Sequence, residues 1–463
     1  MKGNETWQGG NAVMRIAIVG CTHAGTAAVT QIAAAHPEAT VDVYERRSDI
    51  SFLSCGIALY LEGTVTAPEQ LFYASKESLE ALGPNIHIHL QHDVLSVDRK
   101  RHTLAIQDMV DHHKFTASYD KLIVSTGSYP VIPPIQGVSV PRVLMCKNYD
   151  DALAIKQTAE GADRIAIIGG GYIGVELAEA YSRTGHDILF INGVHHLLSH
   201  YVDAPLAKEV EAELAAHGVD SHLQEVALKF DSDDQHVYIT TDKGEWQADL
   251  AVVCVGFQPM TELVDGQVKM NADGSIHVND YMQTSSPDIY AAGDTVAVHY
   301  NPTHKDAYAP LATNAVRQGK LAGINVFGNK TRYMGTQATS ALRLYDKTLA
   351  CTGLTLSRAQ KAGFDAAAVD LVDNYRPEFM PTTARVSLRL VYDRSNRRIL
   401  GGQLFSQYDI AQSANLLSVM IQNRNTIDDL AYVDMLFNPY YDRPWNYLNL
   451  LGQKAVEQAD ATH

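Results

Sequence analysis

Cysteine is scarce in this sequence, and the few cysteines lie far apart. Only 5 of the 463 residues are cysteine, namely Cys21, Cys55, Cys146, Cys254 and Cys351. No C-x-x-C pair and no Cys/His group with metal-ligand spacing is present, so we expect no metal site. Few, scattered and odd-numbered cysteines also exclude a disulfide framework. They are typical of a reducing compartment, so we expect a cytoplasmic protein.

Long hydrophobic runs and an excess of positive charge are also missing. No apolar stretch is long enough to span a bilayer, and the polar first residues lack the apolar core of a secretion signal. The formal net charge of −16 disfavours nucleic acid and anionic membranes. We therefore expect no nucleic-acid partner, no membrane partner, and a disordered extension over residues 1–13.

The sequence does contain a strand–turn–helix–strand pattern at residues 15–45, with a glycine-rich turn. The turn reads G-x-T-x-x-G, with Gly20 at the tight bend, Thr22 in place of the usual second glycine, and Gly25 where helix and strand pack closely. Glu45 ends the second strand, where a carboxylate can accept hydrogen bonds from a ribose diol. These features predict a nucleotide-binding unit.

The pattern returns at residues 164–192, now with a complete G-x-G-x-x-G formed by Gly169, Gly171 and Gly174. A dinucleotide pyrophosphate binds at such a turn, against the helix N-terminus. Asn192 ends the following strand, where an acidic residue would indicate NAD and a nearby arginine NADP. Two such units predict an α/β protein with two Rossmann-like domains and leave the choice between NADH and NADPH weakly specified.

One cysteine, Cys55, stands in the stretch S-F-L-S-C-G, just before a helix-compatible run at residues 57–61. A helix N-terminus presents free N–H groups and a positive dipole end, which favour thiolate over thiol. The stretch alone also fits a small, buried and unreactive cysteine, which is the commoner case. A dithiol pair would need a second cysteine five residues on, but that residue is Tyr60.

Six motifs together resemble the single-cysteine flavoprotein disulfide reductase family. They are GCTHAG at 20–25, SFLSCG at 51–56, STGS at 125–128, GGGYIG at 169–174, AAGD at 291–294 and FNPYYDRPWN at 437–446. The chain looks like the water-forming NADH oxidases of this family, whose relatives are NADH peroxidases and coenzyme A disulfide reductases. The resemblance covers roughly residues 14–452.

This resemblance implies two Rossmann-like domains, one for FAD and one for NAD(P), and a C-terminal α+β dimerisation domain. We expect the FAD-binding domain at 14–120 and 250–330, the NAD(P)-binding domain at 121–249, and an interface domain at 331–463. We also expect a homodimer, with the tail at 437–445 contributing to the partner's active site.

The resemblance also implies cofactor-binding residues. Besides the first glycine turn and Glu45, the residues expected along FAD are Thr126, Gly127, Asp294, Leu311, Ala312 and Asn314, and Gly256 is expected as a further cofactor-binding residue. The second turn, with Ile173 and Asn192, is expected to bind NADH, with NADPH possible. Tyr172 resembles a gating tyrosine that covers the flavin until NADH displaces it, and Glu176 resembles a glutamate beside the nicotinamide. Helix packing and surface charge are the alternative explanation for both.

In the implied chemistry, NAD(P)H reduces FAD, and O₂ is reduced by four electrons to water. Cys55 cycles between thiolate and sulfenate, and His23 handles a proton, where a chance surface histidine is the alternative. An NADH peroxidase would share both residues. A coenzyme A disulfide reductase is disfavoured by His23 and by the PYYDRPWN tail. A flavoprotein redox sensor, with Cys55 as its switch, is the alternative without catalysis.

Overall fold

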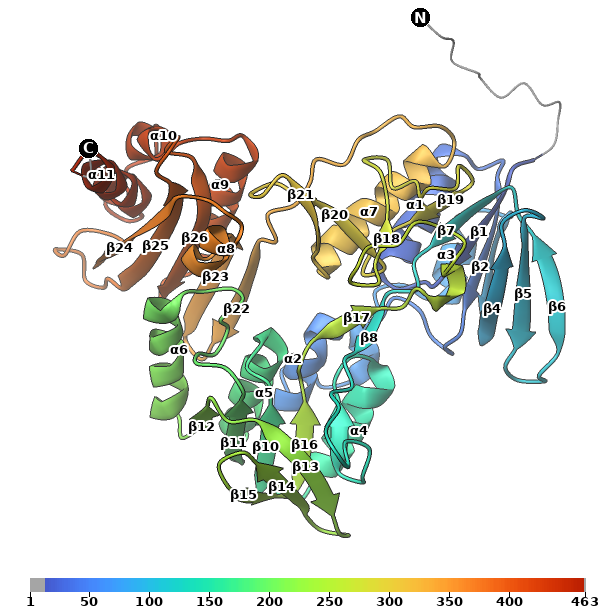
Figure 1. The fold of residues 1–463 in the computed structure, drawn as a ribbon, viewed down its shortest axis with the longest axis horizontal. Helices are drawn as coiled ribbons and strands as arrows, with labels where there is room; N and C mark the ends of the chain where they lie inside the picture. Colours follow the sequence, from blue (N-terminus) through green and yellow to red (C-terminus); the bar gives the residue numbers. More distant parts are fainter. Residues whose placement is uncertain (1–12, 462–463) are drawn as a thin grey trace, which may run out of the picture.

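The computed structural model describes residues 13–461, so the predicted extension at 1–13 lies outside the described residues except for Val13. The chain forms three domains, each built around a β-sheet. In Figure 1 the first domain lies on the right, the second at the bottom and the third on the left. Among residues 13–461, no helix is long and apolar enough to cross a membrane.

The first domain is built on a parallel sheet in the order β19-β7-β1-β2-β3. Strands β1, β7 and β19 are apolar and largely buried, as expected for a parallel sheet covered on both faces, whereas the edge strand β3 leaves His87 exposed. The bounds are β1 (Arg15–Val19), β2 (Thr40–Glu45), β3 (Ile86–Leu90), β7 (Lys121–Val124) and β19 (Ile289–Ala291). Two smaller sheets flank it. One is antiparallel and consists of β4 (His92–Asp98), β5 (Thr103–Asp108) and β6 (Lys114–Ser118). The other is mixed, with β20 (Val296–Tyr300) parallel to β18 (Ile276–His277) and antiparallel to β21 (Lys305–Tyr308).

Helices α1 (His23–Ala35) and α7 (Ala312–Asn325) lie side by side on this sheet, although they are far apart in the sequence (Figure 1). Their contact depends on Gly319, where an added Cβ would lie 2.1 Å from the carbonyl oxygen of Ala24. The shorter elements of this part of the chain are η1 (Ser54–Gly56), α2 (Ile57–Glu62), η2 (Pro68–Leu71), α3 (Lys76–Glu80) and η3 (Glu262–Val264). Of these, α2 packs against the second domain, where Ile57 and Leu61 join its core.

The second domain repeats this plan with a parallel sheet in the order β12-β11-β10-β16-β9. The strands are β9 (Val143–Met145), β10 (Arg164–Ile168), β11 (Asp187–Asn192), β12 (Asp220–Leu223) and β16 (Leu250–Val253). Its helices are α4 (Tyr149–Ala159), α5 (Tyr172–Arg183) and α6 (Ala204–Ala216). An antiparallel sheet of β13 (Ala227–Ser232), β14 (Val237–Thr241) and β15 (Glu245–Ala248) covers one side.

The domain boundaries differ from those predicted at residues 120 and 250. Strand β7 belongs to the first sheet, and β16 belongs to the second. The chain crosses between the domains a few residues later each time, through the antiparallel pair β8 (Ser128–Pro130) and β17 (Phe257–Pro259). The boundaries were wrong because pairing with distant strands, rather than local sequence, assigns β7 and β16 to their sheets.

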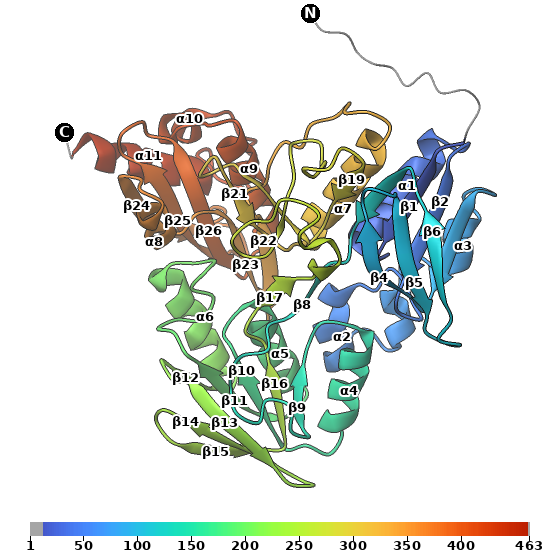
Figure 2. The ribbon, with the colours of Figure 1, turned by 45° about the vertical axis from the view of Figure 1, so that its right-hand side comes forward.

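The third domain has an antiparallel sheet in the order β22-β23-β26-β25-β24 with helices on it. The strands are β22 (Ser340–Leu344), β23 (Lys347–Gly353), β24 (Ala366–Asn374), β25 (Arg385–Asp393) and β26 (Ile399–Ser406). The helices are α8 (Leu356–Lys361), α9 (Ala411–Gln422), α10 (Ile427–Tyr432) and α11 (Tyr447–Asp460). Figures 1 and 2 show β22 and β23 reaching down to the second domain, where β22 contacts α5.

Candidate active site

One large cavity, of about 1340 Å³, lies where the three domains meet. It is lined by both glycine turns, by the stretch around Cys55 and by the start of β22. All but three of the predicted site residues line it; the exceptions are Gly25, Gly174 and Asn314. The predicted site residues therefore meet at one cavity, whose wall is completed by many residues that were not predicted.

Gly25 and Gly174 lie behind the cavity wall, each in the first turn of its helix. An added Cβ on either glycine would lie 2.0 Å from the carbonyl oxygen of the first glycine of its turn, Gly20 or Gly169. Both therefore allow the helix to approach the turn, which is the packing role expected of a third fingerprint glycine. At Gly171, Gly127 and Gly256 an added Cβ would meet nothing within 4 Å.

Glu45 is buried and holds the first turn in place. Its Oε2 accepts from the Cys21 N–H at 2.8 Å, and its Oε1 accepts from the Arg47 N–H at 3.0 Å. Burial raises the pKa of the Glu45 carboxyl, against the effect of these two hydrogen bonds. A carboxylate has about four acceptor positions, so capacity remains for a ribose diol at the cavity surface.

Cys55 lies in η1 with its side chain exposed to the cavity. Removal of water by the cavity walls raises the pKa of the Cys55 thiol, and the negative charge of Glu176 adds to this. The Lys147 ammonium acts in the opposite direction. Helix α2 follows as predicted, but its N-terminus does not by itself make Cys55 a thiolate, because α2 is short and burial outweighs it.

His23 begins α1 and is held by a residue that the sequence did not indicate, Tyr73. The His23 Nδ1 lies 2.9 Å from the Tyr73 hydroxyl, and the two rings are stacked at 7°. The other ring nitrogen, Nε2, is buried and has no hydrogen-bond partner. Burial lowers the pKa of His23, so the ring is neutral near pH 7. Tyr73 comes from a loop fifty positions away, which no local motif connects to His23.

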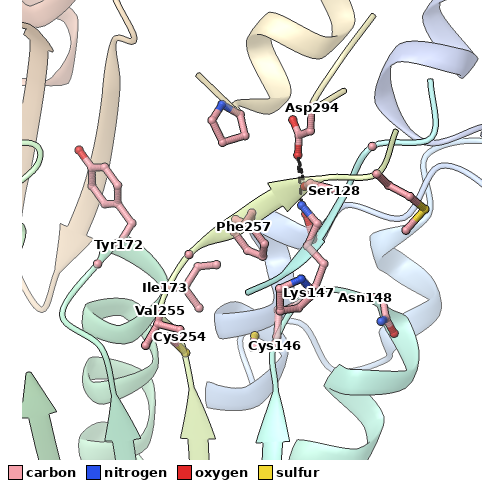
Figure 3. A pocket seen from close by; sticks show the side chains of 18 of the residues that line it. Ser128, Cys146, Lys147, Asn148, Tyr172, Ile173, Cys254, Val255, Phe257 and Asp294 are labelled. Atoms are coloured by element: carbon pink, nitrogen blue, oxygen red, sulfur yellow. Dashed lines mark hydrogen bonds and ion pairs between the residues drawn. The ribbon is translucent and has the colours of Figure 1, made fainter. Parts of the chain in front are cut away.

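Lys147 is the second residue that the sequence did not indicate. Its Nζ lies 3.2 Å from Asp294 Oδ2 and 4.1 Å above the centre of the Phe257 ring. The same Asp294 oxygen accepts from the Ser128 hydroxyl at 2.7 Å (Figure 3). The Lys147 charge lowers the pKa values of both Cys55 and His23. Lys147 is therefore a cation placed within reach of both predicted catalytic residues.

Glu176 lies one turn into α5 and lines the cavity. Burial, and then the nearby charge of Glu179, raise the pKa of Glu176 to about 7. A carboxyl with this pKa changes charge near neutral pH, which is typical of residues that bind or exchange protons at functional sites.

Asn192 lines the cavity, but its amide is occupied by its own loop. Its Oδ1 accepts from the Gly170 N–H at 3.1 Å, and its Nδ2 donates to the carbonyl oxygens of Val194 and His196, both at 3.2 Å. Asn192 therefore shapes the turn and the loop after β11. Because it also lines the cavity, the ribose contact expected from the sequence stays a prediction.

Tyr172 points away from the middle of the cavity, contrary to the predicted position over a flavin. Its hydroxyl lies 2.7 Å from Ser340 Oγ and 3.2 Å from Cys351 Sγ, both in the third domain. Figure 3 shows its ring directed away from Phe257, Lys147 and Asp294. The next residue, Ile173, lines the cavity at the same end of α5.

The N-terminus of α7 faces the cavity with Leu311 and Ala312 in its lining. Asn314, also predicted there, is buried behind it and donates to the Ala309 carbonyl oxygen at 3.0 Å. Its position in the first turn of α7 directs the side chain into the protein, so Asn314 fixes the loop before the helix. Thr126 lines the cavity and donates to the Met260 carbonyl oxygen.

These residues fit FAD and a nicotinamide dinucleotide. Each glycine turn leads into a helix N-terminus, the arrangement that binds a pyrophosphate. The turn at Gly171 leaves open space where a Cβ would stand, and His23 Nε2 is a buried polar atom with no protein partner. The cavity is continuous from one turn to the other, past Cys55.

Comparison with known proteins gives matches over nearly the whole chain. An NADH oxidase of Enterococcus faecalis is 48% identical over 446 residues, covering 96% of this chain and 100% of the relative. The solved structure of a water-forming NADH oxidase from Lactobacillus brevis, bound to NADH, has a TM-score of 0.95 and 51% identity and covers 97% of this chain and 99% of that one. An engineered water-forming NADPH oxidase derived from it, bound to NADPH, matches with the same TM-score of 0.95 and the same identity of 51%, covering 97% of this chain and 100% of its own.

The family comparison covers the same span. Residues 14–319 match the pyridine nucleotide-disulphide oxidoreductase family, and residues 339–446 match its dimerisation domain. These spans contain both glycine turns, Cys55 and the sheet of the third domain. The chain therefore belongs to the pyridine nucleotide-disulphide oxidoreductase family.

Proposed function

We propose that the protein is a FAD-dependent, water-forming NAD(P)H oxidase. One observation carries the proposal: an exposed thiol, Cys55, and an imidazole with a free Nε2, His23, line the same cavity as both nucleotide-binding turns. A thiol without a second cysteine nearby in the sequence suits peroxide reduction through a sulfenate better than dithiol exchange. Similarity to NADH oxidases over the whole chain supports this choice.

FAD, when bound, supplies the acceptor for hydride and the route of electrons to oxygen. The first unit is the part of the chain suited to hold it: Gly20 and Thr22 at the pyrophosphate, Glu45 at the ribose, and Thr126, Gly127, Asp294, Leu311 and Ala312 along the rest. Gly169, Gly171 and Ile173 of the second unit would bind the dinucleotide, with Glu176 beside the nicotinamide.

The hydrogen bond to Tyr73 determines which ring nitrogen of His23 carries the proton. Burial raises the pKa of Tyr73 to about 12, so its hydroxyl keeps its proton and can donate to His23 Nδ1. A neutral imidazole that accepts at Nδ1 carries its proton on Nε2. His23 then presents an N–H donor into the cavity, suited to a negatively charged oxygen.

Cys55 reduces peroxide in this proposal. The thiolate sulfur attacks one oxygen of hydrogen peroxide, an S–O bond forms and the O–O bond breaks. Both peroxide protons leave on the departing oxygen as water, and Cys55 is left as sulfenate. His23 Nε2–H donates a hydrogen bond to the departing oxygen, and Lys147 favours the thiolate. Two electrons from a second NAD(P)H, with two protons, return the sulfenate to thiolate and release a second water.

Oxygen and nucleotide consumption test the proposal together. A water-forming oxidase uses one O₂ for every two NADH and leaves no peroxide, so added catalase changes nothing. Oxygen uptake of one O₂ per NADH, halved by catalase, would instead identify a peroxide-forming oxidase. NADH oxidation that needs added peroxide and consumes no O₂ would identify an NADH peroxidase, which shares Cys55 and His23.

Both nicotinamide nucleotides are proposed as substrates, with NADH preferred. Asn192 lacks the charge that repels a 2′-phosphate, so NADPH should bind measurably. No lysine or arginine follows Asn192 before position 200 to attract that phosphate. The ratio of kcat/KM for the two nucleotides measures the preference.

A homodimer in the reducing cytoplasm is the proposed working state. The segment after α10 exposes large apolar side chains, at 49–69% of their area for Leu436, Phe437, Tyr440 and Tyr441. An exposed patch of this kind marks an interface, and residues 339–446 match a dimerisation domain. Cys55 must be kept reduced between turnovers, which suits a reducing compartment. A sedimentation experiment giving a fully active monomer would contradict the dimer.

A further inference from the structure

Tyr172 joins two domains at the rim of the cavity through a contact that no function has yet explained. It is the first residue of α5, next to the turn that would bind the dinucleotide. Its side chain leaves the second domain and ends between β22 and β23 of the third. There Ser340 and Cys351 are register partners on adjacent strands, and their Oγ and Sγ atoms are 3.5 Å apart.

The contact is a shaped site for a phenol. The Tyr172 hydroxyl lies 2.7 Å from Ser340 Oγ and 3.2 Å from Cys351 Sγ, and the Tyr201 ring packs against the Tyr172 ring at 4.2 Å between centres. Cys351 is buried, and burial raises the pKa values of both the Tyr172 hydroxyl and the Cys351 thiol. All three groups therefore stay protonated and neutral, and the contact is insensitive to pH in the physiological range.

The contact of Tyr172 with Ser340 and Cys351 affects nicotinamide binding only if the Tyr172 ring can also turn into the cavity. Tyr172 also lines the cavity, so its ring borders open space on the side away from Ser340 and Cys351. A ring rotated into that space would lie inside the cavity beside the second glycine turn, where the nicotinamide has to enter in the proposed function. In the position shown, the ring is clear of that space (Figure 3).

We propose that Ser340 and Cys351 form a latch that holds Tyr172 clear of the nicotinamide entrance. The latch belongs to the third domain, so that domain sets the fraction of molecules open to nucleotide. This inference rests on the proposed binding of NAD(P)H at the second unit. The apparent dissociation constant equals the intrinsic one divided by the open fraction, so a weaker latch weakens binding without altering the reacting groups.

Ser340→Ala and Cys351→Ala remove the two hydrogen-bonding partners one at a time. One neutral hydrogen bond is worth roughly a fivefold change in the open-to-closed ratio, so the Kd for NAD⁺ and the KM for NADH should rise together, by up to about fivefold in Ser340→Ala. The effect of Cys351→Ala should be smaller, because sulfur is the weaker partner. Cys351→Ser should restore or improve binding. The value of kcat should stay within about twofold in all of them, since neither residue touches reacting atoms.

The chain offers a matched control in Ser182→Ala. Ser182 Oγ lies 2.7 Å from the Tyr345 hydroxyl, so it forms the same kind of bond between α5 and the third domain, at the far end of the helix from the cavity. This variant should leave both Kd and KM unchanged. An increase equal to that of Ser340→Ala would reveal a general loosening of the domain contact and would overturn the latch.

A double-mutant cycle tests whether Ser340 affects nucleotide binding through the Tyr172 hydroxyl. Tyr172→Phe removes the hydroxyl and keeps the ring, so adding Ser340→Ala to it should cause no further rise in the Kd for NAD⁺, measured by titration calorimetry on the FAD-loaded enzyme. Additive effects, or an unchanged Kd in both single variants, would overturn the proposal. Failure of the proposed function is distinguishable, because it would appear as absent oxygen uptake in the parent enzyme.

Discussion

The two nucleotide-binding units are alike in backbone and different in the side chains at matching positions. In register, Cys21 of the first turn corresponds to Gly170 of the second, and Glu45 at the end of β2 corresponds to Asn192 at the end of β11. Each strand-end side chain accepts a hydrogen bond from the N–H of the second turn residue, at 2.8 Å for Glu45 and 3.1 Å for Asn192.

The remaining atoms of these two side chains do different things. The second Glu45 oxygen accepts from Arg47, and the carboxylate keeps free acceptor positions. The Asn192 amide nitrogen donates both of its protons to its own loop, at Val194 and His196. Glu45 of the first unit thus keeps acceptor positions for FAD, which remains bound between turnovers. Asn192 of the second unit uses its amide to shape the loop beside the site of NAD(P)H, which binds and leaves in each turnover. One motif position therefore does not imply one role.

The largest expected effect comes from removing the chemistry that only the first unit carries. Cys55→Ser should still oxidise NADH and consume O₂, because neither step requires sulfur. Serine cannot form a stable sulfenate, so the variant should release close to one hydrogen peroxide per NADH, where the parent releases almost none. A peroxidase-coupled dye assay measures the yield.

Cys146→Ala is the control for this variant. Cys146 lines the same cavity, but burial raises its pKa to about 12, so it is an unreactive thiol. Its loss should leave the water yield unchanged. Stoichiometric water formation by Cys55→Ser, with no peroxide, would make Cys55 a structural residue and would contradict the proposed mechanism.

The second prediction replaces the carboxylate of the first unit with an amide, the group that Asn192 carries in the second unit. Glu45→Gln can accept only one of the two backbone N–H groups and sets an NH₂ against the other, an unsatisfied buried contact worth about 1–3 kcal/mol. FAD affinity should fall about 10–100-fold. The ratio of absorbance at 450 and 280 nm after desalting measures retained FAD. Full retention in this variant would show that Glu45 does not hold the cofactor.

The reverse exchange, Asn192→Asp, gives the second unit a carboxylate. The variant loses the two hydrogen bonds from the amide nitrogen to the carbonyl oxygens of Val194 and His196, and a carboxylate oxygen then faces these oxygens and repels them. Each lost hydrogen bond destabilises the loop by about 1 kcal/mol. We expect KM to rise about 3–10-fold for both NADH and NADPH, with a smaller change in the ratio of their kcat/KM values. A lower KM for NADH together with a higher one for NADPH would mean that residue 192 contacts the ribose directly.

The smallest effect concerns Glu176, a carboxyl of the second unit whose pKa is raised to near neutrality by burial. Its pKa is about 7 in the folded protein, above the usual 4.5, so the folded state binds more protons than the unfolded state between these values. Stability then falls as the pH rises from about 4.5 to 7. Glu176→Gln should remove this loss and raise the unfolding free energy by about 1 kcal/mol at pH 8, after allowance for partial solvation, with little change at pH 5. Thermal unfolding at the two pH values measures it; an equal shift at both would point to a packing effect instead.

The sequence predicted the two parallel sheets, and most of its candidate site residues lie at one cavity, because these signals are local. The turns at Gly20 and Gly169 each lie within one strand–helix step, and Cys55 directly precedes its helix. The boundaries at residues 120 and 250 were wrong because β7 and β16 could pair equally well, by composition, with either sheet.

Tyr73, Lys147 and the Ser340–Cys351 pair were missed for a different reason. Each meets its partner across a distance in sequence that no periodicity covers, and each partner comes from another element. Asn314 was placed at the cavity by the family resemblance, but its side chain is buried and donates to the Ala309 carbonyl oxygen of the preceding loop. Such contacts follow from packing, which a single sequence does not encode locally.

The interrupted first sheet also sets the order in which the chain can fold during synthesis. The second unit is continuous, and its last strand, β16, ends at Val253. The first unit begins earlier but lacks its edge strand β19 until Ala291 and its packing helix α7 until Asn325. The first unit is therefore completed after the second, although it begins nearer the N-terminus. Its strands β1, β2 and β7 are synthesised before β19 and α7, and the second unit is complete before these last two elements appear. A growing chain of this kind leaves the face of α1 that Gly319 covers in contact with solvent or a chaperone until translation passes α7.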